Sequence, residues 1–193
     1  MDFSFTDDQR QLRDALRGYL ERENGFSART ASARSASGWR ESLWRGLAED
    51  LGILAVGVAE TAGGAGGNAV DIMVVSEELG ANLLVEPFLE TAVIGAAALA
   101  AAGGREAELA AIMLGDMRCA FAWAEAESRF DRAAPATAAT RTAAGWRLDG
   151  RKVVVTAAPY ATHLLVTARG GGEPALFLVE THARGLSLQS YPM

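Results

Sequence analysis

The stretch Trp146-Arg-Leu-Asp-Gly-Arg-Lys-Val-Val-Val-Thr156 decides the fold of the second half of this chain. Its apolar residues lie on both sides of Asp149-Gly150, and an Asp-Gly pair in such a setting is a strong local signal for a β-hairpin. We therefore predict a hairpin that turns at Asp149-Gly150. Other short apolar runs predict three further strands, at 119–123, 163–168 and 175–179, the last two separated by the glycines 170–172.

The first 117 residues instead carry apolar side chains at helical spacing. Thr6 followed by Gln9 predicts a capping box at the start of the first helix, and Asn68 can cap a later one. Pro87 suits the first turn of a long helix that runs to residue 102. Further helices are predicted over 39–51 and 106–114.

Two segments between these helices are predicted to be irregular or extended. Ser27–Ser37 is polar and rich in serine, so we expect a loop there. Ile53–Val58 is apolar and is expected to be extended, followed by a glycine-rich turn over 63–67. The predicted core of this half consists of large apolar residues: Trp39, Leu43, Leu47, Leu79, Leu83 and Leu99.

Helices first and strands afterwards indicate an α+β protein with separate domains. We predict an all-α domain over residues 1–117 and an antiparallel β-domain over residues 118–193. The last residues form no terminal helix, and a sheet of so few strands leaves open edges that proteins usually cover. We therefore expect the β-domain to be incomplete; a complete protein of this length is the alternative.

The charge balance limits the partners. The 193 residues include 18 basic and 24 acidic ones, giving a net charge of −6, which argues against nucleic acid or an anionic membrane surface as the main partner. The acidic N-terminus does not resemble a signal peptide. The most apolar run, 92–102, is shorter than the roughly 20 residues of a membrane helix. We expect a cytoplasmic protein.

The residues alone nominate no catalytic group. Cys119 is the single cysteine and has apolar neighbours, so a buried, inert thiol is expected. His163 and His182 have no acidic cluster around them, so no metal site is predicted. The glycines at 63–67 lack the Lys and Ser/Thr of a phosphate-binding loop, which favours a turn.

The chain resembles the acyl-CoA dehydrogenase family in stretches that occur in the family's order. They are Phe3–Leu12, Leu47–Leu54, Ser76–Gly80, Phe121–Glu125 and Trp146–Lys152. The final stretch, 185–192, is similar to a branch that works as two unlike subunits, exemplified by the small subunit of pimeloyl-CoA dehydrogenase.

The resemblance implies a flavoprotein that uses FAD to dehydrogenate an acyl-CoA thioester between its α and β carbons. It also implies an electron-transfer flavoprotein as acceptor and a homo- or hetero-oligomer. In the family, the flavin lies between the β-domain and a C-terminal helical domain, which supplies the catalytic base in most members. That third domain is absent from these residues, so none is nominated as catalytic.

The resemblance places the flavin against Trp123, Ala124, Glu125, Arg129, Phe130, Val154, Val155 and Thr156. Some of these depart from the family pattern. Ala124 stands in place of a Thr that hydrogen-bonds the flavin ring, Arg129 in place of a Gly, and Phe130 in place of a phosphate-facing Ser. Val154 replaces a Trp, whereas Thr156 keeps the hydroxyl expected near flavin N5.

These departures leave three functions open: a catalytic dehydrogenase subunit, a non-catalytic partner subunit of a heteromeric dehydrogenase, and a non-enzymatic helical binding module. For the first two, we expect Trp123, Ala124, Thr156 and the loop 128–131 to form one wall of a flavin cleft.

Overall fold

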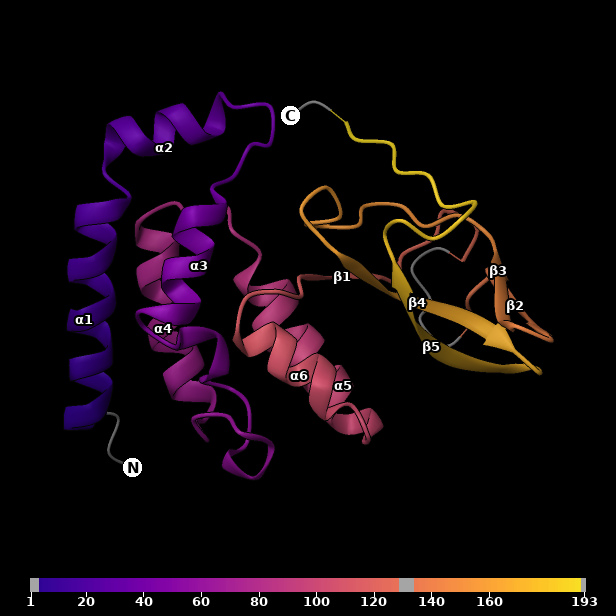
Figure 1. The fold of residues 1–193 in the computed structure, drawn as a ribbon, viewed down its shortest axis with the longest axis horizontal. Coiled ribbons are helices and arrows are strands. Elements are labelled where there is room, and N and C mark those ends of the chain that lie inside the picture. The colour runs from indigo at the N-terminus through magenta and orange to yellow at the C-terminus, as the bar shows by residue number, and fades with distance from the viewer. Residues whose placement is uncertain (1–3, 129–133, 192–193) are drawn as a thin grey trace. The chain divides into compact units, whose positions relative to one another are not determined.

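The computed structural model describes residues 4–128 and 134–191 (Figure 1). The chain divides into two compact units, Met1–Met117 and Arg118–Met193. Helices make up the secondary structure of the first unit, and the second unit contains a β-sheet (Figure 1). The α+β class predicted from the sequence is confirmed.

The helices of the first unit follow one another with short connections. They are α1 (Asp7–Glu23), α2 (Phe26–Ala33), α3 (Glu41–Glu49), η1 (Ile53–Ala55), η2 (Glu60–Ala62), α4 (Ala69–Ala81), η3 (Leu89–Gly95), α5 (Ala96–Ala102) and α6 (Glu106–Met113). Here η1 and η2 are 3-10 turns, and η3 is a π-helical segment that continues directly into α5.

Local capping chemistry sets the helix starts that the sequence predicts. Thr6 Oγ1 accepts a hydrogen bond from the Gln9 backbone N–H at 3.2 Å, and Gln9 Oε1 accepts one from the Thr6 N–H at 3.1 Å. Asn68 and Asp71 form the same reciprocal arrangement at the start of α4. These side chains satisfy N–H groups that have no partner inside the helix, so both predicted caps are confirmed.

Two predictions for the first unit are wrong because contacts distant in sequence override local preference. The loop expected over Ser27–Ser37 is helical as far as Ala33, in α2, which Arg29 ties to the carbonyl of Asn82 at 3.1 Å. Ile53–Val58 is not extended but begins with η1. The glycine-rich turn folds back onto it, with the N–H of Gly67 donating to Val56 O at 2.8 Å.

A core of large apolar side chains joins α1, α3, α4 and the turns between them. Leu16, Leu20, Trp44, Leu47 and Leu54 are fully buried in it. Trp44 also donates its indole N–H to the carbonyl of Gly115 at 2.9 Å, which satisfies the buried polar atom of this ring.

The predicted core residues fall into three groups. Those confirmed as buried are Leu43, Leu47, Leu79 and Leu99. Trp39 is half-buried and packs against the core. Leu83 is 73% exposed, so its prediction is wrong; it lies in the turn after α4 with φ 50°, off the helical path that the apolar spacing assumed.

The sheet of the second unit is mixed. Its strands are β1 (Cys119–Ala122), β2 (Ala138–Thr142), β3 (Gly145–Asp149), β4 (His163–Gly170) and β5 (Glu173–Glu180). β4 pairs with β5 antiparallel, with β1 parallel, and at its end with β2 parallel. The antiparallel prediction therefore holds for β2–β3 and β4–β5 only. The connections from β1 and β2 to β4 are long enough for the crossovers that parallel pairs require.

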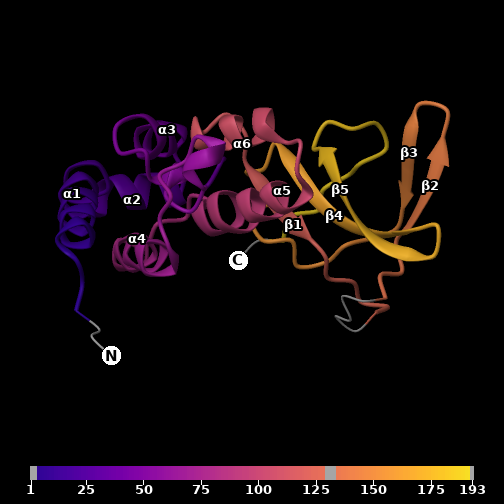
Figure 2. The same cartoon turned by 90° about the horizontal axis from the view of Figure 1, so that it is seen from below.

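The hairpin predicted with its turn at Asp149-Gly150 is also wrong. β3 pairs antiparallel with the preceding strand, β2, and Ala143-Ala144 form the connection between them. The two strands lie side by side in Figures 1 and 2. No strand follows Gly150 until β4 begins. The predicted strands near 163–168 and 175–179 do form a hairpin, and Gly171 and Gly172 both have positive φ at its turn, as type I′ geometry requires.

We predict that Leu47→Ala lowers the free energy of unfolding by about 2–5 kcal/mol, because it leaves a cavity in a fully buried site. Leu83→Ala removes the same atoms from a side chain that is 73% exposed and is the matched control, with an expected change of at most about 0.5 kcal/mol. Urea unfolding of both variants tests this. Equal losses would contradict the assigned core.

Candidate functional site

The segment after β1 and the segment after β3 lie next to each other in the second unit. The N–H of Val153 donates to the carbonyl of Ala124 at 2.9 Å. One residue away on each segment, Lys152 Nζ lies 2.6 Å from Glu125 Oε1. One group of residues that the sequence analysis assigned to the flavin, 123–125, therefore lies beside 152–153, which directly precede the second group, 154–156.

The Glu125 carboxylate is buried and accepts hydrogen bonds from three residues. The residue is 1% exposed. Its Oε1 accepts from Lys152 Nζ and from the backbone N–H and hydroxyl of Thr137, and its Oε2 accepts from the N–H of Ala136. Lys152 Nζ also donates to Thr167 Oγ1 of β4 at 2.9 Å. With its carboxylate occupied in this way, Glu125 braces the neighbouring chain segments.

The pKa of Glu125 reflects two opposing effects. Burial raises it, but the hydrogen bonds from Lys152, Thr137 and Ala136 stabilise the ionised form and outweigh burial, so that the pKa falls from 4.5 to about 2. The carboxylate is therefore ionised at neutral pH and is unsuited to accept a proton as a general base.

Gly150 is required by the packing around this carboxylate. A Cβ built on Gly150 would lie 2.4 Å from Thr137 Oγ1 and 2.7 Å from Thr137 Cα. Because Thr137 donates two hydrogen bonds to Glu125, a side chain at position 150 would displace the group that holds the carboxylate. This close approach accounts for the glycine two residues before Lys152.

Residues 154–157 follow this anchor, and we call them the donor strip. Their backbone N–H groups make no hydrogen bond to the part of the chain that the structure describes. Val155 and Ala157 pack against the apolar core of the second unit. Val154 is 78% exposed and Thr156 is also exposed. The strip therefore combines unpaired donors with an exposed apolar side chain and a hydroxyl.

The backbone of the donor strip is strained. Val154 has φ 52° and Ala157 has φ 64°, in the left-handed region, where a β-branched residue is an outlier. Such conformations cost on the order of 1–3 kcal/mol, persist only where the surroundings impose them, and cluster at ligand sites. Strain beside four donors that have no partner in the described chain supports the hypothesis that the strip faces a ligand.

The remaining predicted site residues contribute less. Trp123 is half-buried, and Ala124 is 3% exposed with its carbonyl bonded to Val153. Neither side chain carries a hydroxyl. Arg129 and Phe130 lie outside the described residues. Whether Trp123 and Thr156 share one wall of a cleft stays a prediction.

Sequence reasoning missed Lys152, Thr137 and Thr167. The available signal was that Lys152 is the only lysine of the chain, placed two residues after a glycine that the packing requires. Nothing in the local sequence pointed to either threonine, because the partners lie 12 to 27 positions apart.

The cysteine, the metal-ligating residue types and the helices of the described residues provide no further candidate site. Burial raises the pKa of the Cys119 thiol to about 12, so it is inert at neutral pH. No cluster of His, Cys, Asp or Glu within 4–128 and 134–191 could hold a metal ion. None of the described helices is long and apolar enough to cross a lipid bilayer.

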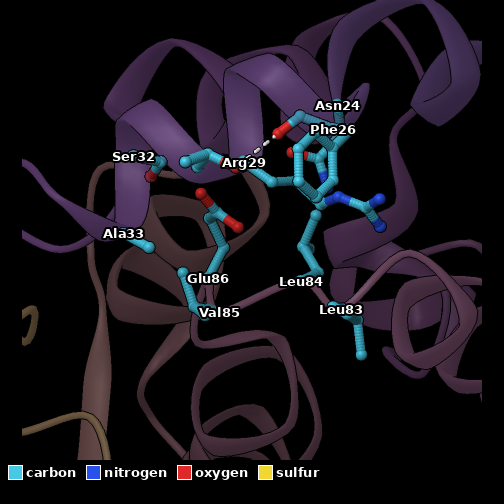
Figure 3. Close-up of a pocket in the computed structure, with 10 residues that line it drawn as sticks. Asn24, Phe26, Arg29, Ser32, Ala33, Leu83, Leu84, Val85 and Glu86 are labelled. Atoms are coloured by element: carbon cyan, nitrogen blue, oxygen red, sulfur yellow. Dashed lines mark hydrogen bonds between the residues drawn. The ribbon is translucent and has the colours of Figure 1, made fainter.

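A pocket of about 260 Å³ lies in the first unit, between α2 and the segment 83–86 (Figure 3). Phe26 and Leu83 line it with large exposed side chains, and the hydroxyl of Ser32 is buried there without a partner in the described chain. Its volume is below the roughly 300–1,000 Å³ of typical small-molecule pockets. An acyl-CoA molecule does not fit into it.

The fold and the site thus define a helical domain followed by a β-domain with a donor-rich strip on its surface. Residues 6–109 match the acyl-CoA dehydrogenase N-terminal domain, and residues 120–192 match the acyl-CoA dehydrogenase middle domain. The chain belongs to the acyl-CoA dehydrogenase family.

Curated relatives are longer than this chain. Acyl-CoA dehydrogenase IpdE2 of Mycobacterium tuberculosis is 38% identical over 96 residues, which is 50% of this chain and 30% of the relative. Benzylmalonyl-CoA dehydrogenase of Aromatoleum aromaticum is 29% identical over 195 residues, 97% of this chain and 51% of the relative. The chain therefore spans about half the length, or less, of these relatives.

Solved structures similar to this chain are also about twice its length. A variant of the Tcur3481-Tcur3483 steroid ACAD has a TM-score of 0.82 and 34% identity, covering 94% of this chain and 50% of that chain. The ChsE4-ChsE5 complex from Mycobacterium tuberculosis has a TM-score of 0.85 and 26% identity, covering 99% of this chain and 52% of that chain.

The lowered pKa of Glu125 predicts a pH dependence of stability. Because the folded pKa lies below the unfolded one, the stabilisation is complete above about pH 4.5 and is lost as the pH falls towards about 2. The pH-dependent part of the free energy of unfolding is roughly 3 kcal/mol. Urea unfolding, followed by NMR signals of β4, should show the free energy of unfolding of the wild type falling relative to that of Glu125→Gln/Lys152→Met over this range. A difference between the two that is independent of pH would contradict the assignment.

The close approach at Gly150 predicts that Gly150→Ala destabilises the second unit by about 1–3 kcal/mol, because the added methyl group overlaps Thr137. Gly80→Ala is the control: its Cβ meets nothing within 4 Å inside α4, and alanine is expected to stabilise a helix by up to about 1 kcal/mol. Thermal unfolding of both variants tests this. A harmless Gly150→Ala would remove the proposed role of the glycine.

Proposed function

We propose that this chain forms the N-terminal and middle domains of a flavin-dependent acyl-CoA dehydrogenase, in which the donor strip faces the flavin. The observation that carries the proposal is the strained backbone of the strip, next to Ala124, in a chain of this family. Within such an enzyme, FAD accepts the hydride that leaves the β carbon of the acyl-CoA thioester.

The residues of the strip suit a flavin ring. The edge of the isoalloxazine carries carbonyl oxygens and ring nitrogens that accept hydrogen bonds, and the strip offers successive N–H groups that no described residue accepts from. The Thr156 hydroxyl adds a further donor, and the exposed Val154 side chain offers an apolar contact for the ring. The role of these residues is to bind and orient the cofactor.

The base that removes the α proton is proposed to lie outside residues 1–193. Such a base must come within about 2.6–3.2 Å of the atom that carries the proton. Of the predicted site residues that the structure describes, Glu125 alone carries a carboxylate, and it is buried and held ionised by Lys152. The chain also spans only about half of relatives that carry the dehydrogenase name.

A non-catalytic partner subunit of a heteromeric dehydrogenase is the second candidate. It is supported by Ala124, which offers no hydroxyl to the flavin, and by the similarity to the ChsE4-ChsE5 complex. In this case, the other subunit supplies the base and further flavin contacts. For either candidate, we propose a cytoplasmic homo- or hetero-oligomer that passes electrons to an electron-transfer flavoprotein.

We predict that purified residues 1–193 are colourless and do not oxidise acyl-CoA with an artificial electron acceptor. A cleft with one wall leaves the flavin exposed, and water then competes for the donors that should stabilise the enolate. The protein from the complete reading frame, co-expressed with any neighbouring dehydrogenase subunit, should show flavin absorbance and activity.

Comparing the complete protein alone with the co-expressed complex distinguishes the catalytic subunit from the non-catalytic partner subunit. If the complete protein is yellow and active alone, it is the catalytic subunit; if both properties need the neighbouring subunit, it is the partner. A yellow, active preparation of residues 1–193 alone would show that the base and the cofactor site are misplaced. A colourless and inactive complete complex would refute the dehydrogenase function.

A further inference from the structure

We propose that Lys152 is a positioning residue for flavin binding, which acts through Glu125 to fix the donor strip. The inference rests on the proposed function and assigns a role to a side chain that does not itself face the ligand. The Lys152 side chain is 9% exposed, and its ammonium joins Glu125, after β1, to Thr167 on β4. It therefore links three parts of the second unit at one point.

The position of Lys152 in the chain connects this link to the donor strip. Lys152 is held by its side chain to Glu125, and the next residue, Val153, is held by its backbone to Ala124 at 2.9 Å. The strip begins immediately afterwards with Val154 at φ 52°. The contacts of Lys152 with Glu125 and of Val153 with Ala124 fix both the place and the direction in which the chain enters the strip.

The other end of the strip is fixed independently. The N–H of Ala158 donates to Val155 O at 3.3 Å, and the N–H of Tyr160 donates to Ala157 O at 2.9 Å. Ala158 is also buried in the apolar core of the second unit. The strained conformation is thus held from both sides, and removal of the Lys152 attachment should let Val154 relax out of the left-handed region.

A purely stabilising role accounts for this arrangement less well. A buried ion pair recovers its desolvation cost only in favourable geometry, and apolar replacements of both partners are often neutral for stability. What this ion pair adds is that it holds Val153 opposite Ala124 and thereby sets the direction of the N–H groups of residues 154–157. The decisive quantities are therefore the local order of the strip and the affinity for FAD.

The test compares Lys152→Met with Thr167→Val, which removes the second acceptor of the same ammonium but leaves the pair with Glu125. In residues 1–193, exchange of the Val153 amide proton is measured by NMR. In the protein from the complete reading frame, with any neighbouring subunit, FAD affinity is measured by quenching of flavin fluorescence. Lys152→Met should accelerate exchange and weaken FAD binding by about tenfold or more each, whereas Thr167→Val should change each by less than about threefold.

Because Lys152→Met leaves the Glu125 carboxylate buried without its ammonium, it can fail to fold. Glu125→Gln/Lys152→Met removes the attachment without an unpaired charge, and the same two effects are expected from it. Unchanged exchange of Val153 in a folded variant overturns the inference, and so does faster exchange with unchanged FAD affinity. A wild-type complete protein or complex that binds no FAD refutes the proposed function, while the exchange comparison still decides whether Lys152 orders the strip.

Discussion

The second unit depends on the buried carboxylate of Glu125. A buried charge is costly unless donors surround it, and the structure supplies these from Ala136, Thr137 and Lys152. The donors come from two distant places in the chain, residues 136–137 before β2 and Lys152 after β3, so satisfying one carboxylate brings these segments and the end of β1 together. Gly150 permits this convergence, because any side chain there would collide with Thr137.

The same interaction clarifies the departures from the family pattern. Ala124 carries no hydroxyl, and its carbonyl is bonded to Val153; in the function we propose, the donor strip that follows therefore makes the polar contacts to the flavin. Backbone N–H groups bind the edge of a ring independently of side-chain identity, so in this proposal Val154 contributes to flavin binding although it is not aromatic. The dehydrogenase function we propose thus rests on backbone geometry more than on motif residues.

The sequence was informative where structure is local and failed where distant contacts decide. The caps at Thr6 and Asn68 were predicted because their hydrogen bonds span two or three residues. The predicted turn at Asp149-Gly150 is wrong, because Gly150 is required by its close packing against Thr137 and not by a hairpin. At the site, the resemblance named Glu125, but its partner Lys152, 27 positions away, was not singled out. The assignment of residues 123–125 and 154–156 to the flavin stays a prediction.

The central claim is that the donor strip faces the flavin. Its most direct test is hydrogen–deuterium exchange of the protein from the complete reading frame, alone or with its neighbouring subunit, with FAD bound and after FAD removal. Our account predicts that bound FAD slows exchange of the amide protons of residues 154–157, which have no partner within the described chain. Protection confined to other segments, with exchange in the strip unchanged, would contradict it.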